Sequence, residues 1–235
     1  GVHNADMLLY LMGPVNSVYA ETSIFEPHRT LLPMTEVAPS LAAMYDHRRE
    51  EGYLFGDEVE QTAVDTAFGV IRFESGAIGQ LGMTDTSHGQ SLGVSTISGS
   101  EGTLYRSQSR SGQSPRILRN DGTELTGDAL LDLVPDFMLD KTTSILWDGE
   151  RRISSYDMDF RLIDSKILAY EYIDMVQAVE SGGQPEVGPE EGIQALALAY
   201  ALVESGVKGE SITLQDVADG LVSFYQDEIN TQMGI

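Results

Sequence analysis

A histidine and an aspartate near the start of the chain are well placed for acid–base chemistry. His3 and Asp6 stand three residues apart, and on a helix this spacing puts both side chains on one face, one turn apart. Histidine titrates near neutrality and can move a proton to or from a substrate hydroxyl, while a nearby carboxylate can orient the ring. The same pattern also fits a helix start capped by Asn4 or Asp6. The spacing alone leaves both interpretations open.

A second set of polar residues lies on one face of an expected strand further along the chain. Strand alternation places Gln80, Thr84, Thr86 and His88 on the same face. This face is polar enough to line a pocket for a hydroxylated ligand. It also fits a solvated strand end, since one face of an antiparallel sheet commonly meets water. His88 is therefore a candidate substrate-binding residue.

The chain offers little for other kinds of site. Its glycine-rich run at 76–82 has Gly-x-x-Gly-x-x-Gly spacing rather than Gly-x-Gly-x-x-Gly, and it falls in an expected hairpin. We therefore expect no dinucleotide site in this chain. The sequence has no cysteine and no side-chain cluster with metal-ligand spacing, so we expect no metal site.

Helices are expected at both ends of the chain. Residues 2–12 carry an apolar stripe that Gly13-Pro14 terminates. Residues 160–180, 189–204 and 214–229 carry apolar positions at helical spacing. Because domains seldom begin with a core helix, we expect the chain to be the C-terminal part of a longer protein.

The middle of the chain has the pattern of β-structure. Alternation predicts a strand over 15–25 and a hairpin formed by 62–73 and 77–87. Further strands are predicted at 91–98, 102–107, 115–120, 144–147 and 151–154. The short connections make neighbouring strands antiparallel. The expected fold class is α+β, with an open, predominantly antiparallel sheet covered by helices on one face.

Residues 26–60 interrupt this pattern. Three prolines and a charged run indicate an insert with a short helix near 40–51, and a long insert in a compact domain is functional or disordered.

The charge balance excludes several partners. The 235 residues include 37 Asp and Glu against 14 Lys and Arg, a formal charge of −23. Such acidity repels nucleic acid and anionic membrane surfaces, and no apolar run approaches the roughly 18 residues of a membrane span. We expect a cytoplasmic protein without nucleic-acid or membrane partners.

Several motifs resemble one enzyme family. The stretch GVHNADMLLYLMG at 1–13 resembles the G-x-H-x-x-D-x-x-x-x-x-x-G helix of the glucose-fructose oxidoreductase/inositol dehydrogenase/MocA (Gfo/Idh/MocA) family. AFGVIRFESGAIGQLG at 67–82 and SGSEGTL at 98–104 look like its central hairpin and next strand. EYIDMVQAVESGGQPEV at 171–187 and the stretch 192–214 look like its last helices and strand. The resemblance leaves 26–60 and 107–160 uncovered.

The resemblance implies a role for the whole chain. Residues 1–235 would be the substrate-binding and oligomerisation domain, similar to the C-terminal domain of dihydrodipicolinate reductase, of an NAD(P)-dependent oxidoreductase. The substrate would be a secondary hydroxyl of a sugar, cyclitol or related polyol. NAD or NADP would be held mainly by an upstream Rossmann domain, so the isolated chain is expected to be inactive. A homo-oligomer through the open sheet face is also implied.

The resemblance also assigns residues. His3 falls on the family's catalytic histidine, whose usual acidic companion, four positions earlier, would precede Gly1. Asp6 falls on the helix aspartate that commonly contacts substrate hydroxyls. Apart from the resemblance, Asn4 and His88 are also expected to bind substrate.

Two other functions fit the same residues. One is a non-catalytic module for oligomerisation and ligand binding, because an exposed sheet face can be buried between subunits. The other is an enzyme that uses NAD transiently to cleave a glycoside, which would accumulate no net NADH.

Overall fold

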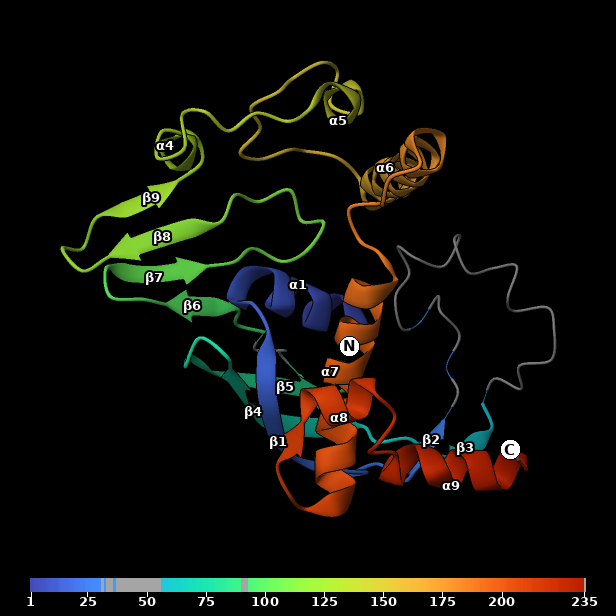
Figure 1. Cartoon of the computed structure of the whole chain (residues 1–235). Coiled ribbons are helices and arrows are strands. Elements are labelled where there is room, and N and C mark those ends of the chain that lie inside the picture. Colours follow the sequence, from blue (N-terminus) through green and yellow to red (C-terminus); the bar gives the residue numbers. More distant parts are fainter. Residues whose placement is uncertain (31, 33–35, 37–55, 90–92, 235) are drawn as a thin grey trace. The chain divides into compact units, whose positions relative to one another are not determined.

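The structure, a computed structural model, describes residues 1–30, 32, 36, 56–89 and 93–234. The chain divides into two compact units, residues 1–90 with 187–235, and residues 91–186. Each unit is described by itself, with the elements labelled in Figure 1. The fold class is α+β with antiparallel sheets, as predicted. Among the described residues, no helix is both long enough and apolar enough to cross a membrane.

The first unit is built on a four-stranded antiparallel sheet with the order β10-β1-β4-β5. Its strands are β1 (Val15–Ser23), β4 (Thr66–Phe73), β5 (Ile78–Thr84) and β10 (Ile212–Thr213). The strand predicted at 15–25 and the predicted hairpin are confirmed. Gly76, with φ of 87°, makes the turn between β4 and β5, a backbone conformation that glycine adopts without strain.

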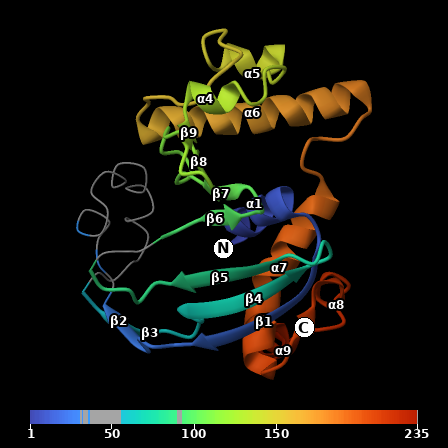
Figure 2. The same ribbon diagram turned by 90° about the vertical axis from the view of Figure 1, so that its left-hand side faces the viewer.

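The two faces of this sheet differ. On β4, Ala67, Ile71 and Phe73 are buried, whereas Phe68 and Val70 between them are exposed. The buried face packs against α1 (Val2–Met12) and α7 (Pro189–Lys208), which Figure 2 shows beside the sheet. The core cluster draws on both helices and on β1 and β4. The helices therefore cover one face, and the opposite face of the sheet carries the exposed side chains.

The end of the chain forms two short helices, α8 (Leu214–Ala218) and α9 (Phe224–Met233). The single helix predicted over 214–229 is wrong, because the chain turns at Gly220 with φ of 69°. The α9 N-terminus is fastened from α7: the buried Glu204 carboxylate accepts hydrogen bonds from the backbone N–H of Tyr225 (2.9 Å) and Gln226 (3.4 Å). A side chain of another helix thus satisfies N–H groups that α9 cannot pair internally.

A two-stranded ribbon lies at the ends of the predicted insert. β2 (His28–Thr30) pairs antiparallel with β3 (Glu58–Glu60). The short helix predicted near 40–51 lies outside the described residues.

The second unit has its own four-stranded antiparallel sheet, β6-β7-β8-β9, so the predicted strands form separate sheets rather than one. Its elements are β6 (Thr96–Ser98), β7 (Gly102–Tyr105), β8 (Arg116–Arg119), β9 (Glu124–Thr126), α4 (Asp128–Leu131), α5 (Lys141–Ile145) and α6 (Phe160–Ser181). The predicted long helix near 160–180 is confirmed.

The strands predicted at 144–147 and 151–154 are wrong. Residues from Lys141 to Ile145 form α5, and the Asp140 side chain caps this helix by accepting from Thr142 N (2.7 Å) and Thr143 N (3.1 Å). The following segment is held by Arg152, whose guanidinium donates to four backbone carbonyls, those of Leu131, Val134, Pro135 and Phe137.

Candidate active site

The first two turns of α1 carry three of the predicted site residues. His3 and Asn4 are exposed and Asp6 is half-buried. Ala5, between them, is buried in the core. Gly1 takes the N-cap position, so Asn4 and Asp6 lie inside the helix and neither caps it. The structure thus keeps His3 and Asp6 on a helix as predicted, with His3 on the solvent side.

The start of α1 lies over the end of β5. A Cβ added at Gly1 would lie 3.8 Å from Met83 Sδ. Two glycines show which residues of β5 point to each face of the sheet. A Cβ at Gly79 would contact Phe73 on the buried face, and a Cβ at Gly82 would contact Phe68 on the exposed face. Strand alternation therefore turns Met83 toward the helices. His3 stands at the end of the sheet where β5 finishes.

His88 belongs to the same end of the sheet, where it is paired with Glu26. Its Nε2 is hydrogen-bonded to Glu26 Oε1, and its side chain is 82% exposed. Glu26 Oε2 lies 3.4 Å from Arg29 Nε, and Arg29 Nη2 lies 3.7 Å from Asp65 Oδ2. We name these four residues the Glu26 network. No hydrogen bond or ion pair joins it to His3 among the described residues.

Asp65 anchors this network. Its side chain is fully buried and accepts hydrogen bonds from Phe25 N (3.1 and 2.9 Å) and Glu26 N (2.9 Å). Burial alone would raise the pKa of Asp65, but these backbone hydrogen bonds, a hydrogen bond from Thr66 and the charge of Arg29 together hold that pKa below its ordinary value. Asp65 is therefore an ionised buried carboxylate.

The threonines predicted to line a pocket hydrogen-bond with one another. Thr84 Oγ1 lies 2.9 Å from both Thr66 Oγ1 and Thr86 Oγ1, and Thr66 and Thr86 are 3.2 Å apart. Gln80, the fourth residue of that face, is exposed on β5 opposite Val70 of β4. The hydroxyls of Thr84 and Thr86 are thus engaged with each other and with that of Thr66, while His88 is hydrogen-bonded to Glu26.

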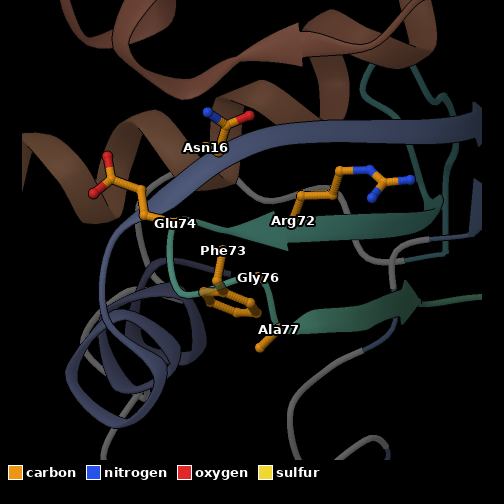
Figure 3. Close-up of a pocket in the computed structure, with 6 residues that line it drawn as sticks. All are labelled: Asn16, Arg72, Phe73, Glu74, Gly76 and Ala77. Carbon is orange, nitrogen blue, oxygen red and sulfur yellow. The ribbon is translucent and has the colours of Figure 1, made fainter.

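A shallow hollow lies at the other end of this sheet. It has a volume of about 230 Å³ and is lined by Asn16, Arg72, Phe73, Glu74, Gly76 and Ala77. Figure 3 shows the Asn16 and Glu74 side chains on one side of the strands and Phe73 on the other. Asn16 sits in a bulge of β1, where the pairing with β4 shifts by one residue. None of the predicted site residues lines this hollow.

The described residues do not fit a dinucleotide. All the strand pairs among them are antiparallel, and the glycine-rich run lies in the β4–β5 hairpin rather than between a strand and a helix. No group of three or more His, Asp or Glu side chains that could hold a metal occurs in the described part of the chain.

The sequence analysis missed Glu26, Arg29 and Asp65. Glu26 and His88 are 62 residues apart in the chain, and Asp65 is 39 residues from Glu26, so no local spacing could join them. The one available signal was the position of Asp65 immediately before a strongly alternating strand.

Comparison with protein families decides the relationship. The model of an oxidoreductase family's C-terminal alpha/beta domain, the Gfo/Idh/MocA type, matches residues 1–214. The chain belongs to this family. A comparison with the curated proteins finds no match.

Solved structures of oxidoreductases share the fold of this Gfo/Idh/MocA domain. Levoglucosan dehydrogenase in complex with NADH and L-sorbose is 21% identical, with a TM-score of 0.60 over 92% of this chain and 50% of its own. An NAD-binding oxidoreductase from Klebsiella pneumoniae is 18% identical, with a TM-score of 0.59 over 91% and 49%. An Agrobacterium radiobacter oxidoreductase in complex with NAD+, L-tartaric acid and magnesium is 15% identical, with a TM-score of 0.54 over 92% and 48%. The chain spans about half the length of these proteins.

Proposed function

We propose that the full-length protein is an NAD(P)-dependent oxidoreductase that acts on a secondary hydroxyl of a sugar, cyclitol or related polyol. This chain would be its substrate-side C-terminal domain. The family match over residues 1–214 supports an oxidoreductase, and levoglucosan dehydrogenase, which shares the fold, was solved with NADH and a sugar. The observation that carries the proposal is the exposed His3 in the first turn of α1, one turn from Asp6.

His3 is assigned the proton chemistry. Oxidation of a hydroxyl removes its proton, and a neutral imidazole at hydrogen-bond distance can accept it. Asp6, Asn4 and His88 are assigned to the remaining hydroxyls of the substrate, because carboxylate, amide and imidazole groups all pair with hydroxyls. Since the described residues do not fit a dinucleotide, NAD or NADP would be held mainly by residues outside them, and the isolated chain would be inactive. We also propose a cytoplasmic location for the protein.

The experiment is the His3→Ala variant of the full-length protein. We expect kcat/KM for polyol oxidation to fall by a factor of about 100 or more, the usual range for a general base. His28→Ala is the matched control, since His28 is also exposed but lies on the β2–β3 ribbon beside Glu58. A His3→Ala variant that keeps kcat/KM within about twofold of the wild type would sink the catalytic assignment.

We also propose that the protein forms a homo-oligomer through the open face of the first unit's sheet. That face exposes the apolar side chains of Tyr19, Phe68, Val70 and Ile78, which are 40–63% accessible. A contiguous exposed apolar patch commonly marks a protein–protein interface. The same observation favours the alternative of a non-catalytic association module. Sedimentation of the full-length Phe68→Glu variant tests the interface: a mass unchanged from the wild type would contradict it.

A further inference from the structure

The inference concerns how His88 is held. Glu26 uses its two carboxylate oxygens for different partners: Oε1 pairs with His88 Nε2, and Oε2 lies 3.4 Å from Arg29 Nε. Arg29 in turn lies 3.7 Å from the buried Asp65 carboxylate. The ring of His88 is thus connected to the interior of the first unit through two further charged side chains.

The backbone of Glu26 is fixed as well. Its N–H donates to Asp65 Oδ2 at 2.9 Å, and the N–H of Phe25 donates to both oxygens of the same carboxylate. Glu26 is therefore held at its main chain by a hydrogen bond to Asp65, and its side chain forms an ion pair with Arg29 Nε, which makes no hydrogen bond. A carboxylate restrained in this way presents one oxygen in a defined position, which an exposed surface carboxylate does not do.

For a neutral ring, this arrangement determines which nitrogen of His88 carries the proton. An ionised carboxylate only accepts hydrogen bonds, so a neutral His88 paired through Nε2 carries its proton there. Its Nδ1 then has a free lone pair that accepts a hydrogen bond. Because the side chain is 82% exposed, a ligand hydroxyl can reach the ring.

We propose that Glu26 is a positioning residue for His88, and that the pair presents Nδ1 of His88 to a hydroxyl of an uncharged polyol. The inference rests on the proposed function, because it names the class of substrate that would bind at the end of the sheet where His3 lies. The start of α1, which carries His3, lies over Met83, five residues before His88.

The charges of the network favour an uncharged ligand. Glu26 and Asp65 contribute two negative charges and Arg29 one positive charge, in a chain with a formal charge of −23. The Nε and Nη2 atoms of Arg29, which face the two carboxylates, are buried, so an anionic ligand cannot pair with them. A sugar phosphate or sugar acid is repelled here, and a neutral sugar or cyclitol is not.

The first test reads the imidazole directly. In the full-length protein, 15N NMR of the His88 ring, assigned by its loss in His88→Phe and followed over a pH titration, should show that the neutral ring carries its proton on Nε2. Glu26→Ala should convert this signal to a mixture of the two ring forms, whereas Glu26→Gln, whose amide oxygen still accepts from Nε2–H, should largely retain it. A wild-type ring protonated on Nδ1 alone, or a Glu26→Ala ring that is unchanged, overturns the proposal.

The second test is kinetic, with D-glucose, D-galactose, D-sorbitol and myo-inositol as probes and D-glucose 6-phosphate as the charged counterpart. For the best neutral probe, His88→Phe should raise KM about tenfold with kcat within about threefold, as expected when one ground-state contact is lost. Glu26→Ala should raise KM by less, and Glu26→Ala combined with His88→Phe should be no worse than His88→Phe alone. Glu58→Ala, which removes the partner of His28, is the matched control and should leave KM unchanged.

The outcomes separate the two levels of the proposal. Additive effects of Glu26→Ala and His88→Phe would show that Glu26 does not act through His88 and would overturn the positioning role. A lower KM for D-glucose 6-phosphate than for the neutral probes would overturn the substrate class. If no probe is oxidised by the wild type, the proposed function fails, while the NMR result still decides the role of Glu26.

Discussion

The two longest helices, α6 and α7, have nearly the same length but are stabilised in different ways. α7 has 20 residues, seven of them buried, whereas α6 has 22 residues and buries only Ile163 and Ala178. Apolar residues of α6 such as Leu168, Tyr172 and Val179 are 46–75% exposed. α7 therefore owes its stability to burial of an apolar face, which is the usual source of helix stability in proteins.

The second unit relies more on polar contacts to its own backbone. Arg152 donates to four carbonyls, Lys166 donates to the carbonyl of Leu146, and Asp140 caps α5. Such contacts hold loops in place, but each contributes little net free energy compared with burial of a large apolar side chain. The comparison indicates that the first unit is destabilised most by substitutions in its buried core. The second unit is destabilised most by loss of its polar contacts to the backbone.

The largest effect is expected from the core of the first unit. Leu198 of α7 is completely buried, so Leu198→Ala should lower the free energy of unfolding by about 2–5 kcal/mol. Leu168→Ala on α6, whose side chain is 46% exposed, is the matched control and should change it by only about 0.5 kcal/mol. Urea unfolding followed by far-UV circular dichroism measures both, and equal losses would remove the distinction between the two helices.

A smaller and local effect is expected from Arg152→Ala. The variant loses hydrogen bonds to four carbonyls and should destabilise the second unit by about 2 kcal/mol, since hydrogen bonds to charged groups are the stronger ones. The only tryptophan of the chain, Trp147, lies in this unit, with its ring 5.1 Å from that of Tyr156, so its fluorescence reports this unit alone. Arg151→Ala, which loses a single bond to Leu139 O (2.8 Å), is the control. Identical fluorescence midpoints for the two variants would argue against the role of Arg152.

The smallest effect is expected in the first unit, and it disappears at acid pH. Because the folded-state pKa of Asp65 lies below its ordinary value, its ionisation stabilises the fold above about pH 4, and this contribution is lost as the pH falls further. Asp65→Asn should therefore have a lower Tm than the wild type at pH 7, and the two Tm curves should converge toward pH 3. Asp85→Asn, which alters the neighbouring exposed carboxylate, should keep the wild-type pH profile. Parallel curves for Asp65→Asn and the wild type would exclude the linkage.

Much of the fold could be predicted because its strongest patterns are local. The apolar stripes of α1, α6 and α7 and the alternation of β1, β4 and β5 each lie within about 20 residues. The helix α5 was missed because its five residues include three β-branched ones, Thr142, Thr143 and Ile145, which favour strands. The feature that favours a helix here is the N-cap Asp140, and a single capping residue is a weaker signal than three β-branched residues. The separation of the strands into sheets depends on pairing between distant segments, which alternation does not specify.

The candidate site divides in the same way. His3 and Asp6 could be placed on one helix because their spacing is local. The partner of His88 could not be found, since Glu26 is 62 residues away and is brought to it by hydrogen bonds to Asp65. Thr84 and Thr86 were correctly grouped on one face, but their hydroxyls contact Thr66. Alternation predicts which side chains share a face, but it does not predict which of them hydrogen-bond with one another.

The Glu204 contact bears on where this protein can be shortened. The family match ends at residue 214, ahead of α9, which invites truncation at that point. Yet Glu204 lies within the matched part, and the N–H groups that its buried carboxylate accepts from belong to Tyr225 and Gln226. Removing residues after 214 would leave a buried carboxyl group without these donors, a costly arrangement. A shortened variant that keeps the first unit intact should therefore include α9, rather than end at residue 214 with the family match.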